Sequence, residues 1–200
     1  MFQYQEQLMS TQTKQSYFTP EEYLELERNS LHKHEYQRGL VYAMSGAKKN
    51  HVWITTNLGT LLSFHLANSP CIVSIADMKV RIATADCYYY PDISVTGDKQ
   101  DLETNNDFIL APKLVIEVLS KSTERFDRTD KFIDYQQIPE LQEYVLVSQD
   151  QIQVECFRKQ ITGEWQSRCY ERGDTVEIIS MDFKCPIEKI YHKVLGLIGA

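Results

Sequence analysis

The clearest pattern of hydrophobic and polar positions lies at residues 48–66, where apolar side chains recur at helical spacing and predict the longest amphipathic helix of the chain. A shorter helix is predicted from Thr19-Pro20-Glu21-Glu22, because a Thr-x-x-Glu capping box with proline at the first helical position marks a helix start. A third helix is expected at about residues 123–137. Residues 1–17 are rich in Gln, Ser and Thr without apolar periodicity, which predicts a loose tail.

Alternating or wholly apolar runs predict strands over much of the remaining chain. Gly39 can take the positive φ of a tight turn and separates two short strands between His34 and Met44. Further strands are expected at residues 71–75, 78–82, 88–95, 112–119, 143–147, 152–157, 165–170 and 176–179. The acidic stretch at 97–107 is expected to be a loop. This order of elements predicts an α/β fold with a mixed sheet.

Composition and cysteine usage fit one domain over residues 18–200. The 200 residues are 42% hydrophobic and 24% charged, and no apolar run approaches the length of a membrane span. The beginning of the chain does not resemble a secretory signal, so we expect a cytoplasmic protein. Neither a zinc clamp nor a disulfide framework is predicted, because the five cysteines are widely spaced: Cys71, Cys87, Cys156, Cys169 and Cys185.

The charge balance limits the ways in which the chain could bind a polyanion. It contains 21 Lys and Arg against 28 Asp and Glu, a net charge of −7, which argues against an electrostatic coat for nucleic acid. A nucleic-acid partner would therefore have to bind locally, with the help of a metal ion.

One charged residue is out of place in its segment. Glu117 lies inside the apolar run 114–119, where alternation puts it on the same face as Val115 and Leu119. An unpaired buried carboxylate costs several kcal/mol unless it is protonated, paired or bound to a metal. Glu117 could pair with Arg128 or Lys131 of the following helix, or lie at the solvated end of the strand. It could also converge with Asp92, at the start of another strand, to hold a hard divalent cation.

These residues occur in an order that resembles a known family. Pro91-Asp92, Glu117 within Ile-Glu-Val-Leu-Ser, the segment 123–135 with Lys131, and Glu143-Tyr144-Val145-Leu146-Val147 resemble the Uma-type family of "putative endonucleases". That family belongs to the PD-(D/E)XK, restriction-endonuclease-like superfamily. The resemblance covers about residues 19–195 and implies a mixed β-sheet core flanked by helices, with extra C-terminal strands.

The resemblance implies roles for individual residues. Asp92 and Glu117 look like the two metal-binding acids of the superfamily, and Glu35 resembles an additional early glutamate that could hold a second ion or its water. The position two residues after Glu117, where the motif has its catalytic lysine, is Leu119. Lys131 is the candidate for a displaced catalytic lysine, with Lys79 in reserve. A further positive charge is expected from Arg125 and Arg128, on the same helix as Lys131, as contacts to DNA phosphates.

The implied activity is hydrolysis of DNA phosphodiester bonds with Mg²⁺, or Mn²⁺, bound by Asp92, Glu117 and Glu35. A homodimer is expected, because cutting both strands of a duplex needs two sites. The alternatives are a catalytically inactive module that keeps the fold and binds nucleic acid or protein, and a hydrolase of small phosphoesters. His51, which begins the long helix, is interpreted as forming local helix-end hydrogen bonds rather than as catalytic.

Overall fold

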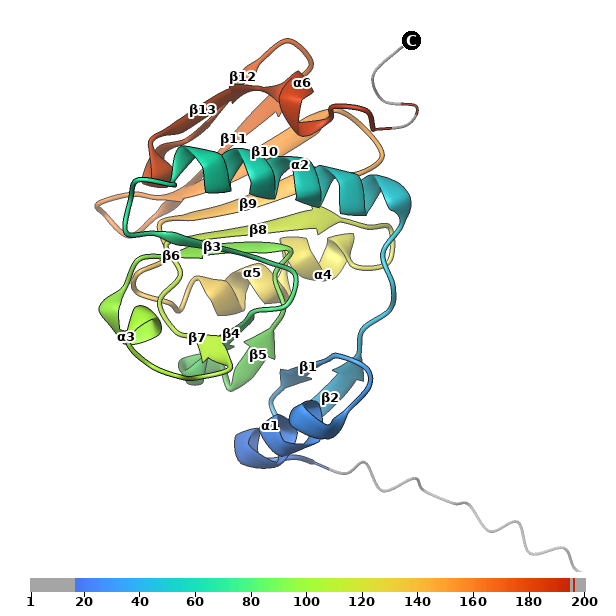
Figure 1. Cartoon of the computed structure of the whole chain (residues 1–200), viewed down its shortest axis with the longest axis vertical. Helices are drawn as coiled ribbons and strands as arrows, with labels where there is room; N and C mark the ends of the chain where they lie inside the picture. The colour runs from blue at the N-terminus through green and yellow to red at the C-terminus, as the bar shows by residue number, and fades with distance from the viewer. Residues whose placement is uncertain (1–16, 195, 197–200) are drawn as a thin grey trace, which may run out of the picture.

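The computed structural model describes residues 17–194 and residue 196, and it has the mixed α/β architecture predicted from the sequence (Figure 1). The tail predicted at residues 1–17 lies outside the described residues, apart from Tyr17. Three sheets are present in this part of the chain. The central sheet has six strands in the order β11 (Trp165–Glu171), β10 (Gln153–Lys159), β9 (Glu143–Ser148), β8 (Leu114–Leu119), β6 (Ile93–Thr96) and β3 (Ile72–Ile75).

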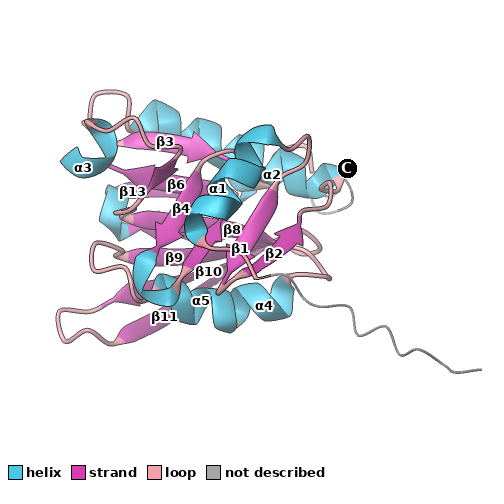
Figure 2. Cartoon of the chain, turned by 90° about the horizontal axis from the view of Figure 1, so that it is seen from below, coloured by secondary structure: helices cyan, strands magenta, loops and turns pink. Residues whose placement is uncertain are grey.

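The second sheet has five strands and carries the N-terminal hairpin. Its order is β2 (Leu40–Ala43), β1 (His34–Gln37), β5 (Cys87–Tyr89), β4 (Lys79–Ile82) and β7 (Phe108–Ile109). A third sheet pairs β12 (Thr175–Ile178) with β13 (Phe183–Pro186). Helix α1 (Pro20–Asn29) packs beside β1 (Figure 2), and its Tyr23 forms a buried aromatic cluster with Tyr36 of β1 and Tyr88 of β5.

Strand β8 is the centre of the fold, because it is covered on both faces. It runs parallel to β9 and antiparallel to β6, so the predicted mixed sheet is confirmed. Ile116 and Val118 pack with helix α2 (Lys49–His65), whereas Val115 and Leu119 pack with Phe132 of helix α5 (Asp130–Tyr135). All six residues of β8 are buried, as the continuous apolar run predicted.

Two local predictions are confirmed, the start of α1 and the turn around Gly39. Thr19 accepts a hydrogen bond from Glu22 N at 3.2 Å while Glu22 accepts one from Thr19 N at 2.8 Å, which completes the capping box of α1. The hairpin around Gly39 is antiparallel, with φ of 49° at Arg38 and 88° at Gly39. The cysteines are all free, and none of the described helices is long and apolar enough to span a membrane.

Three predicted boundaries are wrong. The single strand expected at 88–95 is two strands in different sheets, because Pro91 has no N–H for a ladder and the chain changes sheets at Tyr90-Pro91-Asp92. The loop expected at 97–107 contains the one-turn helix α3 (Lys99–Leu102), capped by Asp98. The helix expected at 123–137 is broken at Thr129 into α4 (Glu124–Arg128) and α5. Strand β13 and helix α6 (Ile187–Ile190) were not predicted from the sequence.

The hairpin turn offers a matched test of backbone strain. Gly39 and Gly163 both have φ of +88°, but a Cβ at Gly39 would lie 2.7 Å from Tyr17 Cδ1, whereas a Cβ at Gly163 meets nothing within 4 Å. We expect Gly163→Ala to lose about 1–2 kcal/mol of unfolding free energy from the left-handed backbone alone. Gly39→Ala should lose clearly more in urea denaturation, and equal losses would contradict the contact with Tyr17.

Candidate active site

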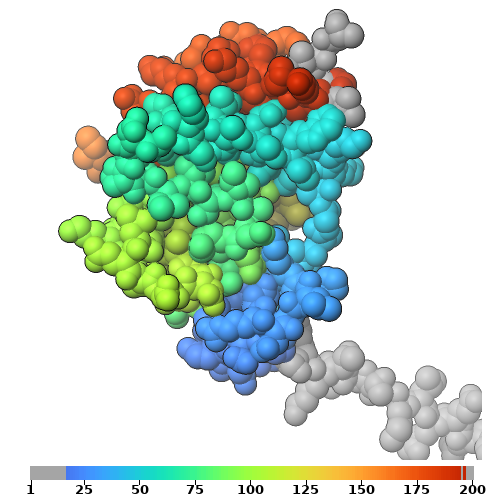
Figure 3. All heavy atoms as spheres, in the orientation of Figure 1, coloured from blue at the N-terminus to red at the C-terminus, as the bar shows by residue number. Residues whose placement is uncertain are grey.

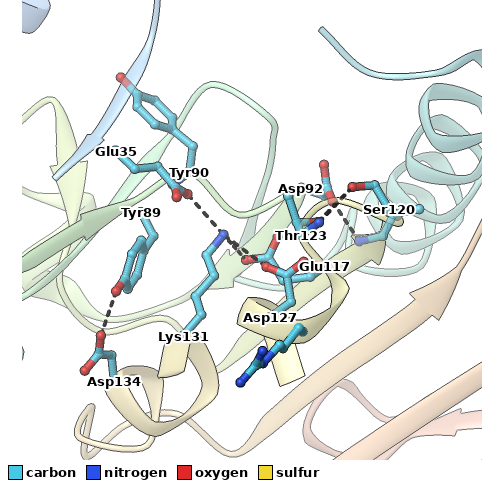
Figure 4. A network of polar contacts seen from close by, with 12 residues as sticks. Glu35, Tyr89, Tyr90, Asp92, Glu117, Ser120, Thr123, Asp127, Lys131 and Asp134 are labelled. Atoms are coloured by element: carbon cyan, nitrogen blue, oxygen red, sulfur yellow. Dashed lines mark hydrogen bonds and ion pairs between the residues drawn. The ribbon is translucent and has the colours of Figure 1, made fainter. Parts of the chain in front are cut away.

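The buried glutamate of β8 meets a lysine from helix α5. Glu117 is 4% exposed and Lys131 is 5% exposed, and their Oε1 and Nζ atoms are 3.0 Å apart. Of the alternatives that the sequence left open, the pairing with Lys131 is the one observed; Arg128 instead contacts Glu124 and Glu155. Figure 4 shows the Lys131 ammonium between Glu35 on one side and Glu117 and Asp127 on the other.

The break between α4 and α5 places this lysine. Thr129 has φ of −121° and ψ of −96°, outside the helical region, and its hydroxyl donates to Arg125 O at 2.7 Å. Such back-bonding by threonine competes with the helical ladder and bends helices. The chain therefore changes direction just before Lys131, whose ammonium also lies 5.2 Å from the centre of the Tyr89 ring.

Asp92 immediately precedes the neighbouring strand β6 and lies across from Glu117. The antiparallel register pairs Ile93 with Ile116, so the next position along each strand brings Asp92 opposite Glu117. Asp92 Oδ2 accepts a hydrogen bond from Val118 N at 2.7 Å, and Oδ1 lies 2.7 Å from His51 Nε2. Both contacts hold the Asp92 carboxylate toward the end of β8 where Glu117 lies.

Glu35 reaches the same place from the second sheet. Its Oε1 lies 3.0 Å from Lys131 Nζ and accepts a hydrogen bond from Tyr90 N at 3.1 Å. Tyr90 has a free N–H because the chain leaves β5 at this residue. The crossing between sheets that the sequence analysis missed thus fixes the third predicted acid.

Burial and mutual repulsion set the charge states of this cluster. Burial raises the pKa of Glu117 well above its usual value; Lys131 opposes the shift, whereas Asp127 and Asp92 add to it. Burial also raises the pKa of Asp127. Burial alone would lower the pKa of Lys131, but Glu117 and Glu35 hold it well above the ordinary value. Lys131 is therefore a fixed positive charge and not a base at neutral pH.

Two residues of the site were missed or undervalued. Asp127 is buried beside Lys131, with Oδ1 3.7 Å from Nζ, although only its position one helical turn before the lysine hinted at this. His51 contacts Asp92 and not only its own helix end, so the local hydrogen bonding that the sequence favoured for His51 does not account for its position, and the contact agrees with the role that the resemblance left open. The signal for His51 was its place at the start of the long helix, which gives no information on which strand the imidazole faces.

Other candidates lie away from the cluster. Lys79 donates to Tyr90 Oη at 3.3 Å and lines a second cleft. Arg125 is exposed on α4, and the break at Thr129 means that it does not share a single helix with Lys131. Arg128 is engaged by Glu155 Oε2 at 2.6 Å and by Glu124 Oε1 at 3.0 Å, so its charge is already compensated.

The cluster forms the floor of a cleft of about 510 Å³, a volume typical of ligand sites. Its walls come from the segment after β2 on one side and from the turn between β8 and α4 on the other. The titratable residues of the cluster all line this cleft: Glu35, His51, Asp92, Glu117, Asp127 and Lys131.

The donor set fits a hard divalent cation. Three carboxyl groups, those of Glu35, Glu117 and Asp127, surround the one ammonium, and the carboxyl of Asp92 lines the same cleft, so oxygen ligands outnumber the single cation. Mg²⁺ is commonly held by only one or two carboxylates and keeps several waters. Among the residues described, no group of three or more His, Cys, Asp or Glu side chains forms a ready-made metal site, so an ion here would take most of its ligands from water.

Comparisons with known proteins give one family match and two relatives that cover most of the chain. The family model described as "Uma2: Putative restriction endonuclease" matches residues 20–188. "Uncharacterized protein slr1290" of Synechocystis sp. is 40% identical over 174 residues, covering 87% of this chain and 91% of that protein. "Uncharacterized protein sll1609" of the same organism is 34% identical over 148 residues, or 74% and 84% of the two chains.

A solved structure supports the fold. The crystal structure of "a putative nuclease belonging to DUF820" from Anabaena variabilis superposes with a TM-score of 0.72 at 17% identity. The match covers 87% of this chain and 97% of the other. At this identity the likeness concerns the architecture, which confirms the mixed sheet flanked by helices and followed by C-terminal strands.

The lysine at the centre of the cluster gives a pH-dependent prediction. Lys131→Met removes the charge that opposes the burial effect on Glu117, so the pKa of Glu117 should rise further. A carboxyl whose pKa is higher in the folded state contributes stability at low pH and loses it as pH rises through that folded pKa. Measured by urea denaturation in EDTA, the variant should lose about 3–5 kcal/mol at pH 8 and clearly less at pH 5. Lys121→Met, at an exposed position, should change little; a pH-independent loss at Lys131 would contradict the coupling.

Proposed function

The chain belongs to the Uma2 family of "putative restriction endonucleases", and on that basis we propose that it is a metal-dependent endonuclease that hydrolyses DNA phosphodiester bonds. The observation that carries the proposal is the convergence of Asp92, Glu117 and Lys131, from two adjacent strands and a helix, on the floor of one cleft.

Asp92 and Glu117 are the proposed ligands of a Mg²⁺ or Mn²⁺ ion, with Glu35 near enough to the same floor to assist. When bound, such an ion activates a water as nucleophile and stabilises negative charge that develops on the phosphate. His51 and Val118 N orient the Asp92 carboxylate by contacts of 2.7 Å each. Partners of this kind, which hold a ligand in place, contribute strongly to metal sites.

Lys131 takes the electrostatic role that the missing in-strand lysine would play. Its raised pKa keeps it protonated, so it acts through its charge on the phosphate in the transition state rather than by accepting a proton. Leu119, at the in-strand position, instead packs in the core beside α5. Of the two arginines proposed as phosphate contacts, Arg125 remains the stronger candidate, because Arg128 is held by two glutamates. The homodimer stays a prediction.

The decisive experiment compares two aspartates. Asp92→Asn should lower kcat for cleavage of plasmid and oligonucleotide DNA in Mg²⁺ or Mn²⁺ by at least roughly a hundredfold, because it weakens a ligand while keeping the shape of the side chain. Asp150→Asn, in the exposed turn between β9 and β10, should cleave as the wild type does. Equal cleavage by wild type and Asp92→Asn would overturn the assignment. Turnover of small phosphodiesters without DNA cleavage would favour the hydrolase of small phosphoesters. The absence of any turnover would favour the catalytically inactive module.

Metal binding can be tested without any substrate. At Mn²⁺ about a hundredfold above its Kd, the folded state should gain about 2.7 kcal/mol, which for a chain of this size raises Tm by roughly 5–10 °C. Asp92→Asn and Glu117→Gln should abolish this rise in a thermal melt, and EDTA should reverse it in the wild type. An undiminished rise in both variants would place the ion elsewhere.

A further inference from the structure

A short segment crosses over the mouth of the catalytic cleft. Residues 44–48, which we call the strap, join β2 to α2 and line the cleft opposite Ser120 and Thr123. All five residues of the strap are exposed. The strap is anchored at its two ends, where Met44 N donates to Lys33 O at 2.9 Å and Lys48 O accepts from Val52 N at 3.1 Å.

Between its ends the strap stands away from the rest of the protein. Ser45, Gly46 and Ala47 make no hydrogen bond within the described part of the chain, and a Cβ at Gly46 would meet nothing within 4 Å. Figure 3 shows a gap between this segment and the body of the molecule. The catalytic floor is thus enclosed in a ring, formed by the N-terminal hairpin, the strap, α2 and the two sheets.

The ring is closed by contacts on both sides. The hairpin is held to the body by the β1–β5 pairing and by the ion pair between Glu35 and Lys131. Helix α2 is held by the core that it forms with β8, and by His51 on Asp92. The gap beneath the strap is therefore one route to the floor of the cleft.

The inner wall of the ring has the chemistry of a single-strand site. Tyr42 is 46% exposed and lines the cleft together with Met44 and Phe126. Tyr42 is the cross-strand partner of Glu35, so both side chains lie on the same face of the hairpin. Lys33 and Lys48 line the same cleft. Aromatic side chains on which unstacked bases lie, interspersed with cations for the backbone, are typical of proteins that bind single strands.

From this geometry we propose that the substrate is single-stranded DNA threaded beneath the strap, with a base on Tyr42 and the scissile phosphate over Glu117 and Lys131. This inference rests on the proposed nuclease function and adds the form of its substrate. A cleft of about 510 Å³ has room for a nucleotide but not for a duplex. In a duplex the bases stay stacked inside, so they cannot reach Tyr42, and both strands would have to pass under the strap.

Binding in EDTA tests the proposal apart from catalysis. By fluorescence anisotropy, a linear single-stranded oligonucleotide should bind at least roughly tenfold more tightly than the blunt duplex of the same sequence, and than the same strand closed into a circle, which cannot thread. Tyr42→Ala should weaken binding of the linear strand by roughly five- to a hundredfold, and Tyr42→Phe, which keeps the ring, should not. Equal affinity for the single strand and the duplex would overturn the single-strand assignment. Equal affinity for the linear and the circular oligonucleotide would overturn threading.

Cleavage in Mn²⁺ separates this inference from the function on which it rests. The linear strand should be cut fastest, and the circle and the duplex at least roughly tenfold more slowly. If duplex and single strand are cut equally and Asp92→Asn is inactive on both, the nuclease stands and the substrate form is wrong. If no DNA is cut, the proposed function fails whatever the binding results.

Discussion

The contact between Lys131 and three carboxylates, of which Glu117 and Asp127 are buried, is the interaction on which the rest of the structure depends. Its members come from β1, β8, α4 and α5, so one ammonium joins the N-terminal hairpin to the central sheet and its covering helices. Burying a charge is costly unless it is paired, and one lysine cannot neutralise Glu35, Glu117, Asp127 and the neighbouring Asp92 together. Burial raises the pKa of Glu117 and Asp127 at the floor of the cleft, and a divalent cation bound there would favour their charged forms.

The sequence predicted those parts of the fold and site that depend on local rules. Glu117 was found because a carboxylate is unfavourable in an otherwise apolar strand, and the start of α1 because capping is decided within four residues. The break at Thr129 was not found, since the helical pattern continues through it and only a side-chain bond to Arg125 O shows the competition. His51 was undervalued for a related reason: its partner Asp92 is 41 positions away in the chain.

The crossing at Tyr90-Pro91-Asp92 shows how one error in a boundary can conceal a site. If residues 88–95 formed one strand, they would all belong to a single sheet, and their side chains would point alternately to its two faces. The chain instead leaves one sheet at Tyr90, gives the free N–H of that residue to Glu35, and enters the next sheet with Asp92 aimed at the end of β8. The segment Tyr90-Pro91-Asp92, which belongs to no strand, therefore positions both Glu35 and Asp92. The convergence of these two acids depends on Pro91, which interrupts the hydrogen-bond ladder.

The strap bears on the oligomeric state as well as on the substrate. A homodimer was expected because cutting both strands of a duplex needs two active sites facing a common axis. A ring that admits one strand removes that requirement, since a single site completes the reaction on a single strand. The net charge of −7 argues against an electrostatic coat for a duplex. Lys48 lines the cleft, together with Lys33, which pairs with Asp77, and Lys131, which pairs with Glu35 and Glu117. Local cations and one aromatic ring are enough for a thin, flexible polyanion, because its bases are free to stack while its backbone follows the cleft.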